Sequence, residues 1–202
     1  MSEMIKVCLA GNTMVGKTSI MKKFIDRSFN PELIQPTVGV ESNPRVEMKT
    51  SDGKLVVLTI WDTAGQEVYR NLVPMFFRGA NVTILVAAND DINSIKGTAE
   101  WQEMVLQTAP NCKFLLVVNK ADLPAGEGID DSYISDMGRS IGALETFKTS
   151  AITGQNIDEL FQYIVDSNEI EADDQYLNGL DTNDKVILNI TEENKPKGKG
   201  CC

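Results

Sequence analysis

One eight-residue segment near the start of the chain, Gly-Asn-Thr-Met-Val-Gly-Lys-Thr at 11–18, constrains the fold more than any other. An apolar, strand-like run at 4–10 precedes it, and a helical pattern follows at 17–27. Glycines in such a turn let successive backbone N–H groups point at phosphate oxygens, and the helix N-terminus adds partial positive charge. The segment therefore predicts a phosphate-binding loop, whose contact residues are Gly11, Asn12, Thr13, Met14, Val15, Gly16, Lys17, Thr18 and Ser19.

Within this loop, two side chains have specific roles. Lys17 is expected to reach the outer phosphates, and the Thr18 hydroxyl is expected to bind Mg²⁺. The motif alone does not distinguish GTP from ATP.

The pattern along the rest of the chain predicts an α/β fold. Apolar runs predict strands at 4–10, 55–61, 82–88, 113–119 and 145–149, and a hairpin turn at 51–53 follows a further strand at 45–50. Helical patterns lie near 17–27, 67–78, 92–108, 131–142 and 156–166. Strands that alternate with helices predict a mostly parallel sheet, which binds ligands at the carboxyl ends of its strands.

Composition narrows the partners and the compartment. The net charge of −10 argues against general attraction to nucleic acid, because phosphates would repel the chain. No apolar run reaches the roughly 20 residues that span a bilayer, and the first ten residues lack a secretion signal, so we expect a cytoplasmic protein. Cys8 and Cys112 fall in apolar strands, where we expect reduced thiols in the core.

A second segment, Trp-Asp-Thr-Ala-Gly-Gln-Glu at 61–67, predicts a sensor of the terminal phosphate. Asp62 is placed to hold Mg²⁺ through a water, and Gly65 can offer its N–H to the phosphate. Gln66 both donates and accepts hydrogen bonds, which suits a catalytic residue that orients an attacking water. Thr37 would complete the Mg²⁺ shell only when the terminal phosphate is present. Taken alone, Asp62 could also be a helix cap and Thr37 part of a turn.

A third segment, Asn-Lys-Ala-Asp at 119–122, predicts selection of guanine. The Asp122 carboxylate can accept from both the ring N–H and the exocyclic amine of guanine, and adenine offers no such pair of donors. The next strand ends at 149–151, where a backbone N–H can reach the guanine oxygen. The expected guanine contacts are Phe29, Asn119, Lys120, Asp122, Leu123, Ser150, Ala151 and Ile152. Phe29 could equally be a core residue.

Together these motifs resemble the Ras superfamily of small GTPases over about residues 4–166. The segments at 61–67, 69–70, 76–80 and 149–161 are most similar to the Rab branch, and the interval 119–151 leaves no room for the additional helix of Rho proteins. The resemblance implies a P-loop G domain with a six-stranded, mostly parallel sheet, one antiparallel edge strand and helices on both faces. It also implies switch regions near 31–43 and 62–80.

The chain departs from that family at several positions. Met14 stands where a small residue is customary, and Ile152 stands where a lysine that packs on the base is common. The segment 38–42 lacks the usual Rab aromatic, and the loop before Thr37 has no tyrosine to cover the phosphates.

The chain divides into a G domain at 1–168 and a flexible, largely disordered tail at 169–202, which is too polar to form a core and is interrupted by one apolar island at 186–190. Its ending, Cys201-Cys202, resembles the Rab ending that carries two geranylgeranyl groups. One lipid anchors only marginally whereas two anchor stably, so we expect attachment to the cytosolic face of a membrane. The lysines of the tail, Lys195, Lys197 and Lys199, would add to this attachment.

The sequence therefore predicts a slow GTPase switch that cycles between GTP and GDP. The resemblance implies an exchange factor, an activating protein, a dissociation inhibitor or escort protein, a prenyltransferase and effectors as partners. Three alternatives remain: a nucleotide-binding module with little hydrolysis, a signalling GTPase of the Ras or Rho branch, and a P-loop ATPase or kinase.

Overall fold

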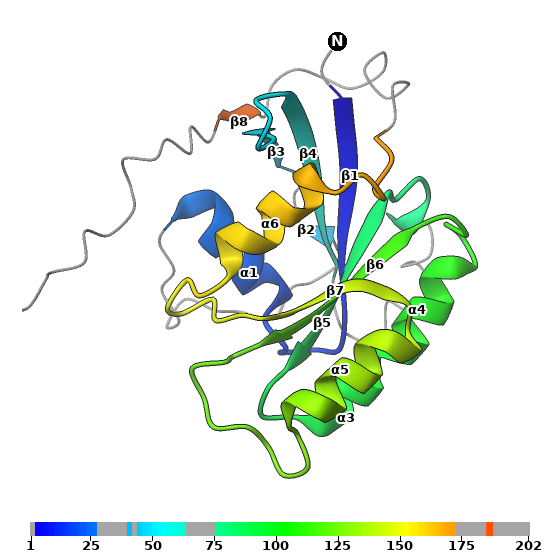
Figure 1. Ribbon diagram of the computed structural model, residues 1–202, viewed down its shortest axis with the longest axis vertical. Coiled ribbons are helices and arrows are strands. Elements are labelled where there is room, and N and C mark those ends of the chain that lie inside the picture. The colour runs from blue at the N-terminus through cyan, green and yellow to red at the C-terminus, as the bar shows by residue number, and fades with distance from the viewer. Residues whose placement is uncertain (1–2, 28–39, 42–43, 64–75, 173–184, 188–202) are drawn as a thin grey trace, which may run out of the picture.

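A computed structural model describes residues 3–27, 40–41, 44–63, 76–172 and 185–187 (Figure 1). The strands are β1 (Glu3–Ala10), β2 (Val40–Glu41), β3 (Arg45–Lys49), β4 (Leu55–Thr63), β5 (Val82–Ala88), β6 (Lys113–Asn119), β7 (Ala143–Lys148) and β8 (Lys185–Ile187). The helices are α1 (Lys17–Asp26), α3 (Ile92–Lys96), α4 (Thr98–Leu106), α5 (Asp131–Ser140) and α6 (Ile157–Asp166). Most of the helix predicted at 67–78 and of the switch region at 31–43 lies outside these residues.

The predicted six-stranded sheet is confirmed, in the order β7-β6-β5-β1-β4-β3. Neighbours from β7 to β4 are parallel, and β3 alone of these six runs antiparallel, joined to β4 by the expected hairpin. In that turn Gly53 has φ +88°, a conformation that favours glycine. Two short strands extend the sheet, because β2 pairs with β4 and β8 pairs with the outer side of β3. The antiparallel edge strand of the six is β3, as expected, and the three residues of β8 pair along part of its outer side.

Helices cover both faces of the sheet (Figure 1). One core lies between the sheet and helices α1 and α6, where the rings of Phe24 and Phe161 stack with centroids 3.8 Å apart. The other lies under α3, α4 and α5 and contains Trp101. Both expected core thiols are buried and free, and burial raises the pKa of Cys8 to about 12 and that of Cys112 to about 11.

Two sequence predictions need correction. The single helix expected at 92–108 is two helices, α3 and α4, which meet at Gly97. The packed region also continues beyond the expected boundary at 168, because Ile170 is buried in the first core and the Asn81 amide donates to the carbonyl oxygen of Glu171 at 2.8 Å.

Part of the predicted tail also forms secondary structure, because residues 185–187 are strand β8. Strand β8 runs parallel to β3, with Val186 opposite Val46, so the apolar island expected at 186–190 contributes to the sheet. Among the described residues, no helix combines the length and the apolar character that a membrane span requires.

The stacked pair between α1 and α6 gives a test of the fold. Replacing Phe161 with alanine removes a fully buried ring, and we expect the free energy of unfolding to fall by about 3–5 kcal/mol. Denaturant unfolding with saturating GDP measures this loss. The control is Glu159→Ala, an exposed change on the same helix that should stay within about 0.5 kcal/mol of the wild type. Equal effects of the two changes would contradict this account of the core.

Candidate nucleotide-binding site

The loop between β1 and α1 is held so closely that two of its positions exclude a side chain. A Cβ on Gly11 would lie 2.1 Å from the carbonyl oxygen of Val86, and one on Gly16 would lie 2.2 Å from Nδ2 of Asn119. Both glycines also have positive φ, at +143° and +100°. The loop therefore has the shape that the sequence motif requires, with its backbone free to approach a ligand at the N-terminus of α1.

Lys17 extends back over this loop. Its ammonium group donates to the carbonyl oxygens of Gly11 and Asn12, both at 2.9 Å, and the side chain is 5% exposed. Burial lowers the pKa of Lys17 to about 8, although the nearby Asp62 carboxylate opposes that shift. A phosphate placed against the loop would favour the charged form of this lysine, because opposite charges raise the pKa of an amine.

Thr18 and Asp62, the two described residues predicted to hold Mg²⁺, meet at the start of α1. The Thr18 hydroxyl donates to Oδ2 of Asp62 at 2.5 Å, and Asp62 is fully buried at the end of β4. A hydroxyl and a carboxylate are oxygen donors, the type of ligand that Mg²⁺ prefers, and Mg²⁺ sites commonly take only one or two carboxylates. The residues present therefore fit a magnesium ion bound beside the phosphate loop.

The Asn119 side chain bridges three segments at the carboxyl end of β6. Its amide nitrogen donates to the carbonyl oxygen of Val15 at 3.0 Å, and its amide oxygen accepts from the Ala151 N–H at 3.2 Å. The hydroxyl of Thr149 donates to the same oxygen at 3.3 Å. Asn119 thus joins the phosphate loop to the two segments predicted to bind guanine, a bridging role that the sequence reasoning missed.

The predicted guanine-binding residues gather beside this bridge. Oδ1 of Asp122 accepts from the Ser150 hydroxyl at 2.5 Å, and the Asp122 carboxylate is exposed. Lys120 has φ +64° and pairs with Asp90 at 3.2 Å, which fixes the turn that carries Asp122. Two apolar side chains of this group face solvent, Leu123 at 41% and Ile152 at 54% exposure. The structure therefore brings Asp122, Ser150 and Ala151 together at one edge of the sheet.

Asn89, which the sequence analysis overlooked, secures the same turn from the neighbouring strand. Its side chain donates to the carbonyl oxygen of Leu123 at 3.0 Å, and its backbone N–H donates to the carbonyl oxygen of Asn119 at 2.8 Å. Its carbonyl oxygen accepts from Gly126 at 2.9 Å. A polar residue directly after a fully buried, mostly apolar strand was the available sequence signal.

Several predicted residues lie outside the described part of the chain. They are the catalytic candidate Gln66, the phosphate and metal candidates Thr37 and Gly65, the base contact Phe29, and the lipidation sites Cys201 and Cys202. Their roles stay predictions.

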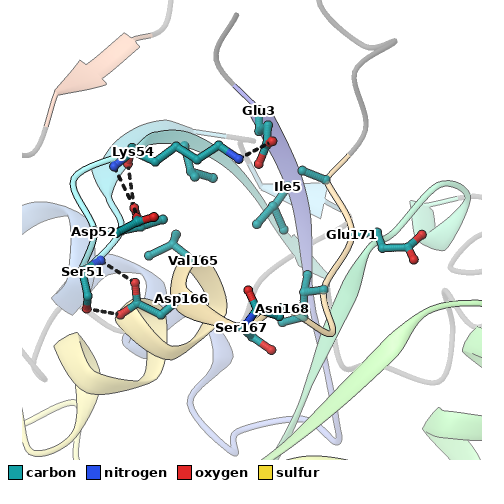
Figure 2. Close-up of a pocket in the computed structure, with 14 residues that line it drawn as sticks. Glu3, Ile5, Ser51, Asp52, Lys54, Val165, Asp166, Ser167, Asn168 and Glu171 are labelled. Carbon is teal, nitrogen blue, oxygen red and sulfur yellow. Dashed lines mark hydrogen bonds and ion pairs between the residues drawn. The ribbon is translucent and has the colours of Figure 1, made fainter.

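A hollow of about 670 Å³ lies at the opposite end of the sheet, between the β3–β4 turn and the C-terminal end of α6. Figure 2 shows two of its charged groups turned toward partners on the protein: Lys54 toward Glu3, and Asp166 toward Ser51. The backbone N–H of Ser51 also donates to Asp166 at 2.6 Å. The lining of this hollow contains no glycine and none of the predicted ligand-binding residues; those that the structure describes gather at the carboxyl ends of the strands.

The contact between Gly16 and Asn119 predicts the effect of a single methyl group. We expect Gly16→Ala to weaken GDP binding at least about tenfold, because the new Cβ displaces the bridging amide and positive φ is strained. Gly53→Ala is the matched control, since Gly53 also has positive φ but its Cβ would meet no atom within 4 Å. It should lower stability by about 1 kcal/mol without changing GDP affinity. Titration with a fluorescent GDP analogue compares the two, and equal affinities would refute the close contact.

Comparisons with known proteins agree with this geometry. The family model described as Ras family matches residues 6–170. Ras-related protein RABG3a of Arabidopsis thaliana is 34% identical, with 98% of this chain and 96% of the relative covered. Ras-related protein Rab-7a of Dictyostelium discoideum is 30% identical over 98% of this chain and 97% of the relative, and a putative ras-related protein Rab-5B from the same organism is 37% identical over 79% and 72%. The phosphate loop, the Thr18–Asp62 pair and these matches together show that the chain belongs to the Ras family, as a Rab-like, GTP-hydrolysing small GTPase.

Proposed function

We propose that this GTPase is a magnesium-dependent molecular switch, whose GTP and GDP forms differ in the segments 31–43 and 62–80. The observation that carries the proposal is the bridge made by Asn119, which joins the phosphate loop to the predicted guanine-binding segments. A ligand that occupied both parts would need a purine base at one end and phosphates at the other. A guanine nucleotide has that form.

The chain's own residues would divide the binding and the chemistry between them. Backbone N–H groups of the loop and the Lys17 ammonium would bind the phosphates. Thr18, Asp62 and Thr37 would hold Mg²⁺, which when bound neutralises developing charge on the phosphates. Gln66 would orient the attacking water, and Gly65 would donate its N–H to the terminal phosphate. Loss of that phosphate would release Thr37 and Gly65 and so change the switch surface.

Guanine would be selected by the turn after β6. Asp122 accepts hydrogen bonds at the rim of the site, and its orientation is supported by the Ser150 hydroxyl. A base with two adjacent donors satisfies this carboxylate, whereas adenine would leave it desolvated without a partner. Phe29, Leu123 and Ile152 would supply the apolar surface against which the base packs.

The switch would act at a membrane in vesicle trafficking, a role typical of Rab proteins. Two lipid groups on Cys201 and Cys202 would attach the chain to the cytosolic face, since two chains give the stable anchoring that one does not. Exchange factors, activating proteins, escort proteins, a prenyltransferase and effectors would be its partners.

A second candidate, a binding module with little hydrolysis, is favoured by one observation. Met14 lies in the phosphate loop with φ +61° and a side chain that is 80% exposed. A long side chain in the left-handed region is unusual, and its position beside the phosphates could hinder approach of the water or of an activating residue.

Single-turnover hydrolysis separates these two functions. We expect Gln66→Leu to lower the rate of GTP hydrolysis at least about tenfold, because leucine cannot orient the water. GTP affinity should be retained. Gln162→Leu on α6 is the control, since Gln162 donates to the carbonyl oxygen of Lys49, far from the site. If Gln66→Leu and the wild type hydrolyse GTP equally slowly, the binding module is the correct function.

The proposed selection of guanine by Asp122 can be tested separately. Asp122→Asn exchanges an acceptor for a donor, so we expect preference to move from guanine to xanthine nucleotides by about 100-fold or more. Competition of GDP and XDP for the site measures this ratio. Asp136→Asn, which removes an exposed carboxylate paired with Arg139 on α5, should leave it unchanged. An unaltered preference in Asp122→Asn would place the guanine elsewhere.

A further inference from the structure

The phosphate loop is tied to the middle of the molecule through a tryptophan on α4. Trp101 is 2% exposed, and its indole N–H donates to the side-chain oxygen of Asn12 at 3.0 Å. Asn12 is the second residue of the loop, 89 positions away in the sequence. Its side chain thus points toward α4, while the phosphate contact expected of the loop residues is through their backbone N–H groups.

Gly97, one turn before Trp101, lies close to the same amide. A Cβ on Gly97 would lie 2.9 Å from Nδ2 and 3.1 Å from Oδ1 of Asn12, so only glycine leaves room for this side chain. The backbone of Gly97 is helical, with φ −62° and ψ −16°, so conformation does not require glycine here. The close approach of Asn12 accounts for this residue at the junction of α3 and α4.

Asn12 in turn holds the phosphate-binding lysine. Its backbone carbonyl oxygen accepts from the Lys17 ammonium group at 2.9 Å. The hydrogen bond from Trp101 therefore fixes the side chain of Asn12, and the backbone carbonyl of the same residue contacts Lys17. If the indole bond were lost, a nearly fully buried donor would lack this partner and the start of the loop would lose its anchor on α4.

We propose that Trp101 and Gly97 are positioning residues for nucleotide binding, which act by holding Asn12 and, through it, the phosphate loop and Lys17. The inference rests on the proposed binding of guanine nucleotide. Neither residue touches the nucleotide in this account. Their effect is to keep the loop in its binding conformation before the ligand arrives, which lowers the cost of ordering it.

The consequence is a mechanical link between α4 and the phosphates. A partner or a substitution that shifts α4 relative to β1 would stretch the bond from Trp101 to Asn12. Nucleotide release would then respond to an event on a helix outside the switch segments.

Release of a fluorescent GDP analogue from the full chain, in Mg²⁺, tests the proposal. Trp101→Phe keeps a buried ring but removes the donor, and it should speed release by about three- to tenfold. Gly97→Ala keeps a backbone conformation that alanine readily adopts, and it should also speed release by pushing Asn12 aside, by more than its change in the midpoint of thermal unfolding accounts for. A merely structural role would change stability and release in parallel.

A double-mutant cycle tests whether Trp101 acts on nucleotide release through Asn12. Asn12→Ala should speed release, and the combination with Trp101→Phe should release GDP no faster than the faster single variant, because both remove the same bond. The control is Gln102→Ala, which removes a hydrogen bond from the adjacent α4 residue to the carbonyl oxygen of Ile141. It should release GDP like the wild type.

The outcomes separate this inference from the function on which it rests. If the wild type fails to bind GDP, the proposed function is wrong. If the wild type binds GDP but Trp101→Phe and Gly97→Ala release it at the wild-type rate, the positioning role is wrong. Additive effects of Trp101→Phe and Asn12→Ala would likewise overturn it, because the two side chains would then act separately.

Discussion

The amide of Asn119 is the contact on which the rest of the site depends. It lies at the end of β6, yet it bonds to residues in the loop after β1 and in the segment after β7. Removing a side chain that bridges buried backbone groups lowers stability, because each backbone group left without its hydrogen bond would need a new partner. These three segments follow parallel strands and therefore lie close together at the carboxyl ends of those strands. The hydrogen bonds of Asn119 then fix the distances between them.

This arrangement also explains how an acidic chain can bind an anionic ligand. The net charge of −10 repels phosphate at long range, so in the proposed function binding would rely on local groups: the loop amides, the N-terminus of α1 and Lys17. Burial lowers the pKa of Lys17, and the adjacent Asp62 opposes that shift. The charge that faces the ligand is therefore set by a few buried groups and not by the overall composition.

The sequence alone predicted what depends on local pattern. The strands and the hairpin at 51–53 were confirmed, because apolar periodicity and turn residues report directly on them. Contacts between distant residues were not visible. Apolar residues continue across Gly97, so the pattern predicted one helix, and it gave no sign that the side chain of Asn12 packs against Gly97 where α3 and α4 meet. Asn119 was expected to contact the guanine base. Its bridging role became apparent only from the positions of the segments after β1, β6 and β7 in the fold.

For strand β8, the sequence indicated an apolar segment but did not show where in the fold that segment packs. The apolar island was visible, but its place depended on the outer side of β3 being open to a parallel strand. Edge strands readily pair with extended segments of other chains, so the pairing with β8 withdraws backbone groups of β3 from such contacts. Because β8 belongs to the same polypeptide, its effective concentration at that edge is high, and a foreign peptide would have to outcompete a tethered neighbour to add itself to the sheet.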